Sequence, residues 1–187
     1  MRTKGEYMSQ AEYNLGKHCG ITFAKLKPAS LYTIKEDEKD TFIHFLDKFR
    51  AKGFEYKIMR EAKGRLLVYV YNRSCLEKIL FDERNRRFLK EKGYNYKTLT
   101  QAVELMRKRL QEEDFPHEIG VFLGYPLEDV RGFIEKPTAR TEFCGYWKVY
   151  SNECEKQKIF DRFRKCTNCI CNRMIAGQSI TKIFQVE

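Results

Sequence analysis

Three cysteines in the C-terminal part of the chain have a spacing that could hold a metal ion or an iron–sulfur cluster. They are Cys166, Cys169 and Cys171, in the phrase RKCTNCICNR. Clustered thiolates are the ligands that zinc and iron–sulfur clusters use in proteins. The apolar residues from Ile159 to Met174 recur at helical spacing, however, and a helix turns Cys171 about 160° away from Cys169. A continuous helix would therefore keep the three thiols from sharing one ion.

A metal site would also need a fourth ligand, because the sequence lacks a second CxxC pair. Cys144, Cys154 and the adjacent pair His18 and Cys19 are the residues available for that role. In the alternative interpretation, which the helical geometry favours, Cys166 is a small buried side chain and the other two are incidental thiols. The sequence implies no particular cofactor, and the candidates for metal ligands are Cys166, Cys169, Cys171, Cys19 and His18.

His18 and Cys19 are also residue types that can form a general base and a nucleophile. Neighbours on a helix diverge by about 100°, and neighbours on a strand point to opposite faces, so a working pair would need His44 or His117 from elsewhere. A packed histidine beside a buried thiol is the interpretation we favour. The sequence contains no glycine-rich phosphate loop, Ser-His-Asp order or HExxH motif. No catalytic residue is therefore predicted, and the sequence leaves open whether the protein is an enzyme.

Positive charge is concentrated in the middle of the chain. The 187 residues include 36 Lys and Arg against 26 Asp and Glu, which gives a formal net charge of +10. Residues 51–113 hold 16 of the basic and 9 of the acidic side chains, so most of the excess lies there. The residues that we expect to bind an anionic partner are Arg60, Lys63, Arg65, Arg84, Arg86, Arg87, Lys90 and Lys92.

Four tyrosines, Tyr69, Tyr71, Tyr94 and Tyr96, are interleaved with these cations. Exposed aromatic rings beside cations could stack on nucleic-acid bases, and the cations alone could bind an acidic protein. The alternative is an ordinary lysine-rich surface facing solvent, because no recognised nucleic-acid-binding motif is present.

Local patterns predict the elements that carry the basic residues. A helix from about residue 36 to 52 should end at Gly53. Two strands, Tyr56–Arg60 and Arg65–Tyr71, should then form a hairpin around a short turn. The second strand is apolar on both of its alternating sets, which is typical of a strand covered on both faces.

Further helices and one further strand are predicted after the hairpin. Ser74 with Glu77 has capping-box spacing, Asp82 should start the helix again, and Thr98 with Gln101 repeats the capping pattern. The remaining predictions are a helix after Pro126, a segment over 117–124 that is ambiguous between helix and strand, a strand over Phe143–Tyr150 and a long helix over 159–174.

These elements predict an α+β protein. We expect a single domain over residues 1–187, with a small, mostly antiparallel sheet of three to four strands packed against several helices. The longest apolar run, Leu66–Tyr71, is far shorter than the roughly 20 residues that cross a bilayer. The N-terminal segment has no secretory signal, and seven cysteines, an odd number, are expected to be reduced thiols. A cytoplasmic location, with no membrane contact, follows as an expectation.

Four phrases of the sequence are similar to a known family. They are HCGITFAKLKPASL at 18–31, GRLLVYVY at 64–71, FPHEIGVFLGYPLEDVRGFI at 115–134 and CGYWKVY at 144–150. In order and over nearly the whole chain, they resemble the bacterial family catalogued as domain of unknown function 3793, which occurs mainly in anaerobes. The resemblance implies a bacterial setting and an acidic redox partner of the flavodoxin kind, and it brings no activity and no catalytic or ligand residues.

The hypothesis that the sequence favours is a small non-catalytic binding module whose basic surface engages an acidic partner. That partner would be a nucleic acid or an acidic redox protein. The alternative is a thiol- or metal-dependent redox accessory protein that uses the cysteine-rich C-terminal segment.

Overall fold

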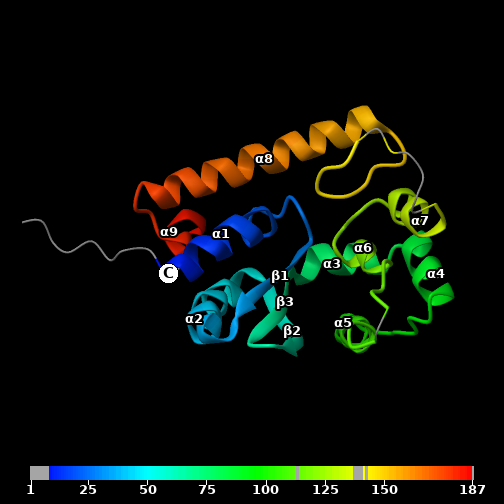
Figure 1. Ribbon diagram of the computed structural model, residues 1–187, viewed down its shortest axis with the longest axis horizontal. Coiled ribbons are helices and arrows are strands. Elements are labelled where there is room, and N and C mark those ends of the chain that lie inside the picture. Colours follow the sequence, from blue (N-terminus) through cyan, green and yellow to red (C-terminus); the bar gives the residue numbers. More distant parts are fainter. Residues whose placement is uncertain (1–8, 113, 137–140, 142, 187) are drawn as a thin grey trace, which may run out of the picture.

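A three-stranded antiparallel sheet lies between two sets of helices (Figure 1). The structure is a computed structural model that describes residues 9–112, 114–136, 141 and 143–186. Its strands are β1 (Ala29–Lys35), β2 (Phe54–Ala62) and β3 (Arg65–Asn72). Its α-helices within the described residues are α1 (Gln10–Phe23), α2 (Lys39–Phe49), α3 (Arg73–Leu80), α4 (Glu83–Glu91), α5 (Leu99–Arg109), α6 (Ile119–Phe122), α7 (Leu127–Glu135), α8 (Glu153–Ile175) and α9 (Ile180–Phe184).

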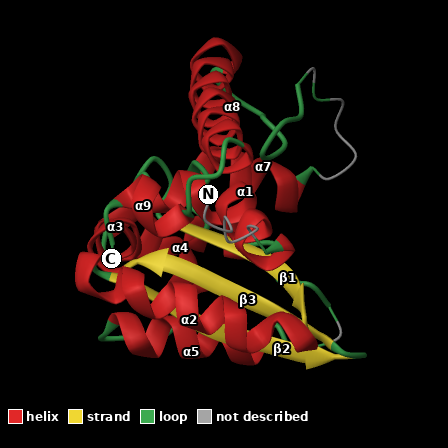
Figure 2. Cartoon of the chain, turned by 90° about the vertical axis from the view of Figure 1, so that its left-hand side faces the viewer, coloured by secondary structure: helices red, strands yellow, loops and turns green. Residues whose placement is uncertain are grey.

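The predicted hairpin is confirmed as β2 and β3. Both turn residues have left-handed backbones, with Lys63 at φ 50° and Gly64 at φ 68°. A two-residue hairpin loop requires positive φ at both positions, and glycine adopts it without strain. β3 is the central strand, with β1 and β2 antiparallel on either side (Figure 2). Its Val68 faces one set of helices and its Tyr69 the other, so both faces of β3 are buried as its apolar pattern predicts.

The third strand is not the one that the sequence predicts. β1 pairs along its whole length with β3, from Ala29 opposite Tyr71 to Lys35 opposite Arg65, and no strand was predicted there. The predicted strand over Phe143–Tyr150 is wrong. Only an isolated bridge between Cys144 and Lys148 forms, and the segment bends back on itself instead of joining the sheet.

The first face of the sheet, which we call the α1 face, is covered by α1, α2, α8 and α9. The helix predicted over 36–52 is confirmed: α2 lies between two short 3₁₀ turns, and the second of these ends at Gly53, whose φ is 78°. Close packing of α1 on α8 requires glycines, since a Cβ on Gly20 would lie 2.7 Å from Ile170. The resulting core is apolar, with Phe49 fully buried and stacked on Phe23 at 3.8 Å between ring centroids.

The second face, the α5 face, is covered by α3, α5 and α6, with α4 and α7 beyond them (Figure 1). The capping box of Thr98 and Gln101 begins α5 as predicted, and Asp82 caps α4 as predicted. The predicted cap of α3 is wrong, because Asn72 rather than Ser74 accepts the hydrogen bond of the first turn, from the amide of Cys75. Asn72 ends β3, so the strand passes directly into the helix.

The ambiguous segment after residue 117 and the C-terminal segment are both helical. α6 is a single short helix, and α8 is a long one that runs without a break through the three clustered cysteines. In Figure 1, α8 extends from α9 at one end of the molecule to α7 at the other. Together the sheet and helices confirm the predicted α+β class. Across the described residues, every helix is too short or too polar to cross a membrane.

Candidate functional site

The structure divides the predicted basic residues into two separate groups. Arg60, Lys63 and Arg65 lie at the exposed end of the β2–β3 hairpin, and the other five lie on and just after α4. Figure 1 shows α5 and α6 between the hairpin and α4. The eight residues therefore do not form one continuous surface.

One helical face of α4 brings three of the cations together. Arg86, Arg87 and Lys90 line the same depression of about 290 Å³, together with Glu83 of the same helix and with Tyr94, Asn95 and Tyr96 from the segment after it. Arg87 pairs with Glu83 one turn away, at 2.8 Å between nitrogen and oxygen. We call Arg86, Arg87, Lys90 and Asn95 the α4 cationic face. It is the densest grouping that the structure makes of the predicted residues.

The remaining residues of the α4 group lie off this face. Arg84 is exposed and Lys92 is half-buried, with its ammonium 5.8 Å from the centroid of the Phe88 ring. The helix itself is held by Asp82, whose carboxylate accepts hydrogen bonds from the amides of Arg84 and Asn85. A capped helix keeps the cations in fixed positions relative to one another.

The four interleaved tyrosines are all buried, with at most 5% of any of them exposed. Their hydroxyl groups donate inward: Tyr69 to the carbonyl of Phe122, Tyr71 to Glu55, Tyr94 to Glu118 and Tyr96 to the carbonyl of Leu80. Burial raises the pKa of Tyr96 to about 12, against the opposing charge of Arg86. These rings are part of the core and cannot stack on bases.

The clustered cysteines lie on a continuous helix, as the sequence predicts. Cys166 is half-buried and packs against the core, Cys171 is also half-buried, and Cys169 is exposed. All seven cysteines and all three histidines are among the described residues. Throughout the described ranges, three histidine, cysteine or acidic side chains nowhere come together in an arrangement that could hold a metal ion.

His18 and Cys19 have different surroundings although they are adjacent on α1. The imidazole of His18 stacks on the ring of Tyr32 at 5.0 Å, and burial together with Lys17 lowers its pKa. Cys19 is completely buried in the α1-face core. Burial raises the pKa of its thiol far above the usual range, so the group stays neutral and is a poor nucleophile.

A second candidate site, which the sequence did not predict, is an apolar cavity at the edge of the α5 face. Its volume is about 320 Å³. Most of its lining is aromatic or aliphatic; His117, Asp129 and Lys148 are polar, and Tyr125 and Trp147 add a hydroxyl group and an indole N–H. The complete lining is Leu31, Phe115, His117, Ile119, Gly120, Leu123, Tyr125, Asp129, Val130, Phe133, Trp147 and Lys148.

Asp129 of α7 fixes one wall of this cavity. Its carboxylate accepts hydrogen bonds from the indole nitrogen of Trp147 at 2.8 Å and from the amides of Tyr150 and Ser151 at 2.8 and 3.2 Å. The ammonium of Lys156, at the start of α8, lies 3.8 Å from the same carboxylate. Because Asp129 and Lys156 are both buried, this ion pair ties α7, α8 and the 143–151 segment together.

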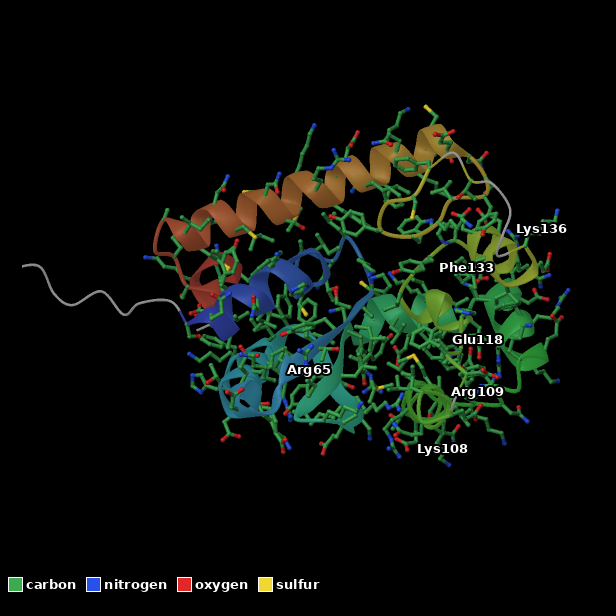
Figure 3. All side chains as sticks on the ribbon, viewed as in Figure 1. Arg65, Lys108, Arg109, Glu118, Phe133 and Lys136 are labelled. Carbon is green, nitrogen blue, oxygen red and sulfur yellow. The ribbon has the colours of Figure 1, made fainter. Side chains whose placement is uncertain are left out.

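A second ion pair, between a partly exposed arginine and a buried glutamate, lies next to the cavity lining in sequence. Arg109, at the end of α5, lies 3.1 Å from the carboxylate of Glu118, which also accepts from the hydroxyl of Tyr94 (Figure 3). Glu118 follows directly after His117, so this contact holds the segment that carries Phe115 and His117. No local pattern in the sequence identifies Arg109 as the partner of Glu118.

Sequence reasoning missed the cavity because its lining comes from distant parts of the chain. β1 supplies Leu31, the 115–134 stretch supplies most of the rest, and the loop before α8 supplies Trp147 and Lys148. One signal was available. Every lining residue falls within three of the four phrases that resemble a known family, at 18–31, 115–134 and 144–150.

The model of a family described as protein of unknown function (DUF3793) matches residues 15–184. No curated protein and no solved structure matches the chain.

Proposed function

The chain belongs to the DUF3793 family, and we propose that it is a non-catalytic binding module whose α4 cationic face binds an acidic surface of another protein. The observation that carries this proposal is the shared depression lined by Arg86, Arg87 and Lys90. Only Arg87 has an acidic partner within the described part of the chain, and that partner, Glu83, is itself largely exposed. The other two cations are free to pair with incoming carboxylates.

The chemistry around this face favours a protein over a nucleic acid as the partner. Tyr94 and Tyr96 also line the depression, but at most 4% of either residue is exposed, so neither ring can stack on a base. Phe81, just before α4, is an exposed ring, and the guanidinium of Arg86 lies 5.7 Å from its centroid. Arginine and aromatic side chains are enriched together at protein–protein interfaces.

The expected strength of binding is modest and depends on salt. Exposed ion pairs contribute about 0.2–1 kcal/mol each, so three of them give selectivity and a fast association rate more than high affinity. Interactions between exposed charges weaken over a Debye length of about 8 Å at physiological ionic strength. The face is therefore expected to act in transient complexes, which would suit an acidic redox protein.

The experiment compares two triple charge reversals in the full-length chain. The test variant is R86E/R87E/K90E, and the matched control is R60E/K63E/R65E, which reverses the same number of charges on the hairpin. Binding of fluorescent poly-L-glutamate and of a single-stranded oligonucleotide is measured by anisotropy at low and moderate salt. We expect the test variant to lose at least about tenfold in poly-L-glutamate affinity and the control less than about threefold.

Three results would contradict this proposal. Absence of poly-L-glutamate binding at low salt would remove the anionic partner altogether. Equal losses in the two variants would show that binding follows net charge and not the α4 cationic face. Oligonucleotide binding that is tighter than poly-L-glutamate binding and depends on Arg86, Arg87 and Lys90 would identify a nucleic acid as the partner. Circular dichroism of each variant checks that the helices are intact.

A further inference from the structure

We infer that the cavity at the edge of the α5 face binds a small, mostly apolar molecule with an aromatic ring. Its volume of about 320 Å³ lies at the lower end of the range of roughly 300 to 1,000 Å³ that is typical of small-ligand pockets. It lies apart from the α4 cationic face, since the two depressions share no lining residue. The inference does not depend on the proposed protein partner.

The rings around the cavity favour an aromatic ligand. Tyr125 and Trp147 stack on one side at 4.9 Å between centroids, and His117 and Phe133 meet edge to face at 4.8 Å. Phe115, more than half of which is exposed, adds a fifth ring at the rim. A planar ring between them would meet both ring faces and ring edges, the arrangements that aromatic pairs prefer.

The polar groups of the lining limit what the ligand can carry. Asp129 turns its carboxylate to Trp147, Tyr150 and Ser151, so it is already satisfied within the protein. The imidazole of His117 contacts the rings of Phe115 and Phe133, and in the described part of the chain it forms no hydrogen bond. A ligand with one hydroxyl or similar polar group can therefore place it against His117, with the hydroxyl of Tyr125 and the ammonium of Lys148 as further polar groups of the lining.

The walls of the cavity are fixed before any ligand arrives. The Arg109–Glu118 pair holds the segment with Phe115 and His117, and the Asp129–Lys156 pair holds Trp147. Figure 3 shows Arg109 and Glu118 close together, with Phe133 nearby on α7. A pre-formed site does not have to be ordered by its ligand, which improves affinity for a small molecule.

The experiment uses the only tryptophan of the chain, Trp147, as a reporter inside the site. The probe is N-phenyl-1-naphthylamine, a neutral three-ring molecule that accepts excitation energy from tryptophan. We expect saturable one-to-one binding, with quenching of Trp147 emission and enhanced probe emission. Absence of saturable quenching in the folded, full-length protein would overturn the inference.

Variants that fill the cavity test the location. Leu123→Phe and Leu31→Phe each add a ring to a different wall, and each should weaken probe binding by about tenfold or more. Ile175→Phe, at an exposed position on α8, makes a similar addition outside the cavity and should leave binding unchanged. Two filling variants are used so that one still decides the question if the other fails to fold. Unchanged affinity in a folded filling variant, or an equal loss in Ile175→Phe, would overturn the inference.

A comparison of two ligands tests the role of His117. His117→Phe should lower the affinity for 1-naphthol by about fivefold, because one hydrogen bond is lost. The same variant should leave binding of naphthalene, which has no polar group, nearly unchanged. Equal changes for the two molecules would show that His117 contributes only its ring.

Discussion

The two faces of the sheet are built in different ways. On the α1 face, α1 packs on α8 through glycines, and the core of Phe23, Phe49 and Phe54 is held by ring contacts. On the α5 face, buried hydroxyl groups and ion pairs join the helices, as in the contact of Tyr69 with the carbonyl of Phe122. Both candidate sites lie beyond the α5 face.

This difference indicates that one face of the sheet contributes mainly to the stability of the fold and the other mainly to binding. An apolar core packed at high density leaves no space for a ligand, and its contribution is to the free energy of unfolding. Directional polar contacts hold helices at fixed positions without filling all the volume between them. The α1 face therefore supports the fold, and the α5 face carries the exposed cations of α4 and the cavity.

The largest expected effect is the loss of a ring from the α1 face. Phe49→Ala should lower the free energy of unfolding by about 3–5 kcal/mol, because Phe49 is completely buried. Urea unfolding followed by circular dichroism measures this change. The matched control is Phe115→Ala at the rim of the cavity, which should cost less than about 1 kcal/mol and weaken probe binding instead. Equal destabilisation by the two substitutions would contradict the division between the faces.

The next effect is the loss of a polar anchor beside the cavity. Asp129→Ala removes four hydrogen bonds and leaves the buried Lys156 without one of its two carboxylates, so a loss of about 3 kcal/mol is expected. Asp161→Ala on α8 is the control, because Asp161 contacts Arg164 and Gln157 at the surface of the same helix and its loss should cost about 0.5 kcal/mol. If both changes had the same small effect in urea unfolding, the ion pair would not be an anchor.

The smallest effect is a dependence on pH at the α5 face. The hydrogen bond from Arg107, with help from Lys57, lowers the pKa of Glu104 from 4.5 to about 2. A carboxylate whose pKa falls on folding stabilises the protein above its ordinary pKa. That stability is lost as the pH falls from about 4.5 towards 2. About one third of the Glu104 side chain is exposed, so solvent limits the contribution to about 1 kcal/mol or less.

Glu104→Gln tests this contribution. The variant should be less stable than the parent protein at pH 7 and nearly equal to it at pH 2, as measured by urea unfolding at both values. Glu61→Gln, at the exposed end of β2, is the control, since Glu61 forms no ion pair in the described part of the chain. A difference between Glu104→Gln and the parent that stays constant with pH would show that the ion pairs of Glu104 are not its cause.

Local signals predicted the elements that local interactions determine. A few neighbouring residues determine the hairpin turn, the end of the helical segment at Gly53 and the start of α5 at Thr98. The prediction of secondary structure failed where a contact with a residue distant in sequence determines the conformation. The alternation over Phe143–Tyr150 suggested a strand. The segment instead forms a loop, in which Trp147 packs edge to face on Phe160 of α8.

The candidate sites divide in the same way. The cations of α4 are close in sequence, so a single helix was enough to predict that Arg86, Arg87 and Lys90 lie together. The hairpin cations were grouped with them only because they are near in sequence, and the fold separates the two groups. The cavity is lined by residues of β1, α6, α7 and the loop at Trp147. No local sequence pattern predicts that these four segments lie close together.

The contact between α1 and α8 has a consequence for how the chain folds during synthesis. α1 is made well before α8. Just after α8, the amide of Ile180 donates to Glu12 across 168 residues of sequence. Until α8 emerges from the ribosome, the side of α1 that carries Gly16 and Gly20 stays uncovered, because Ile170 and Met174 of α8 are the side chains that pack on it. We therefore expect slow, late completion of the α1 face, after α1 has packed on α2 and the sheet.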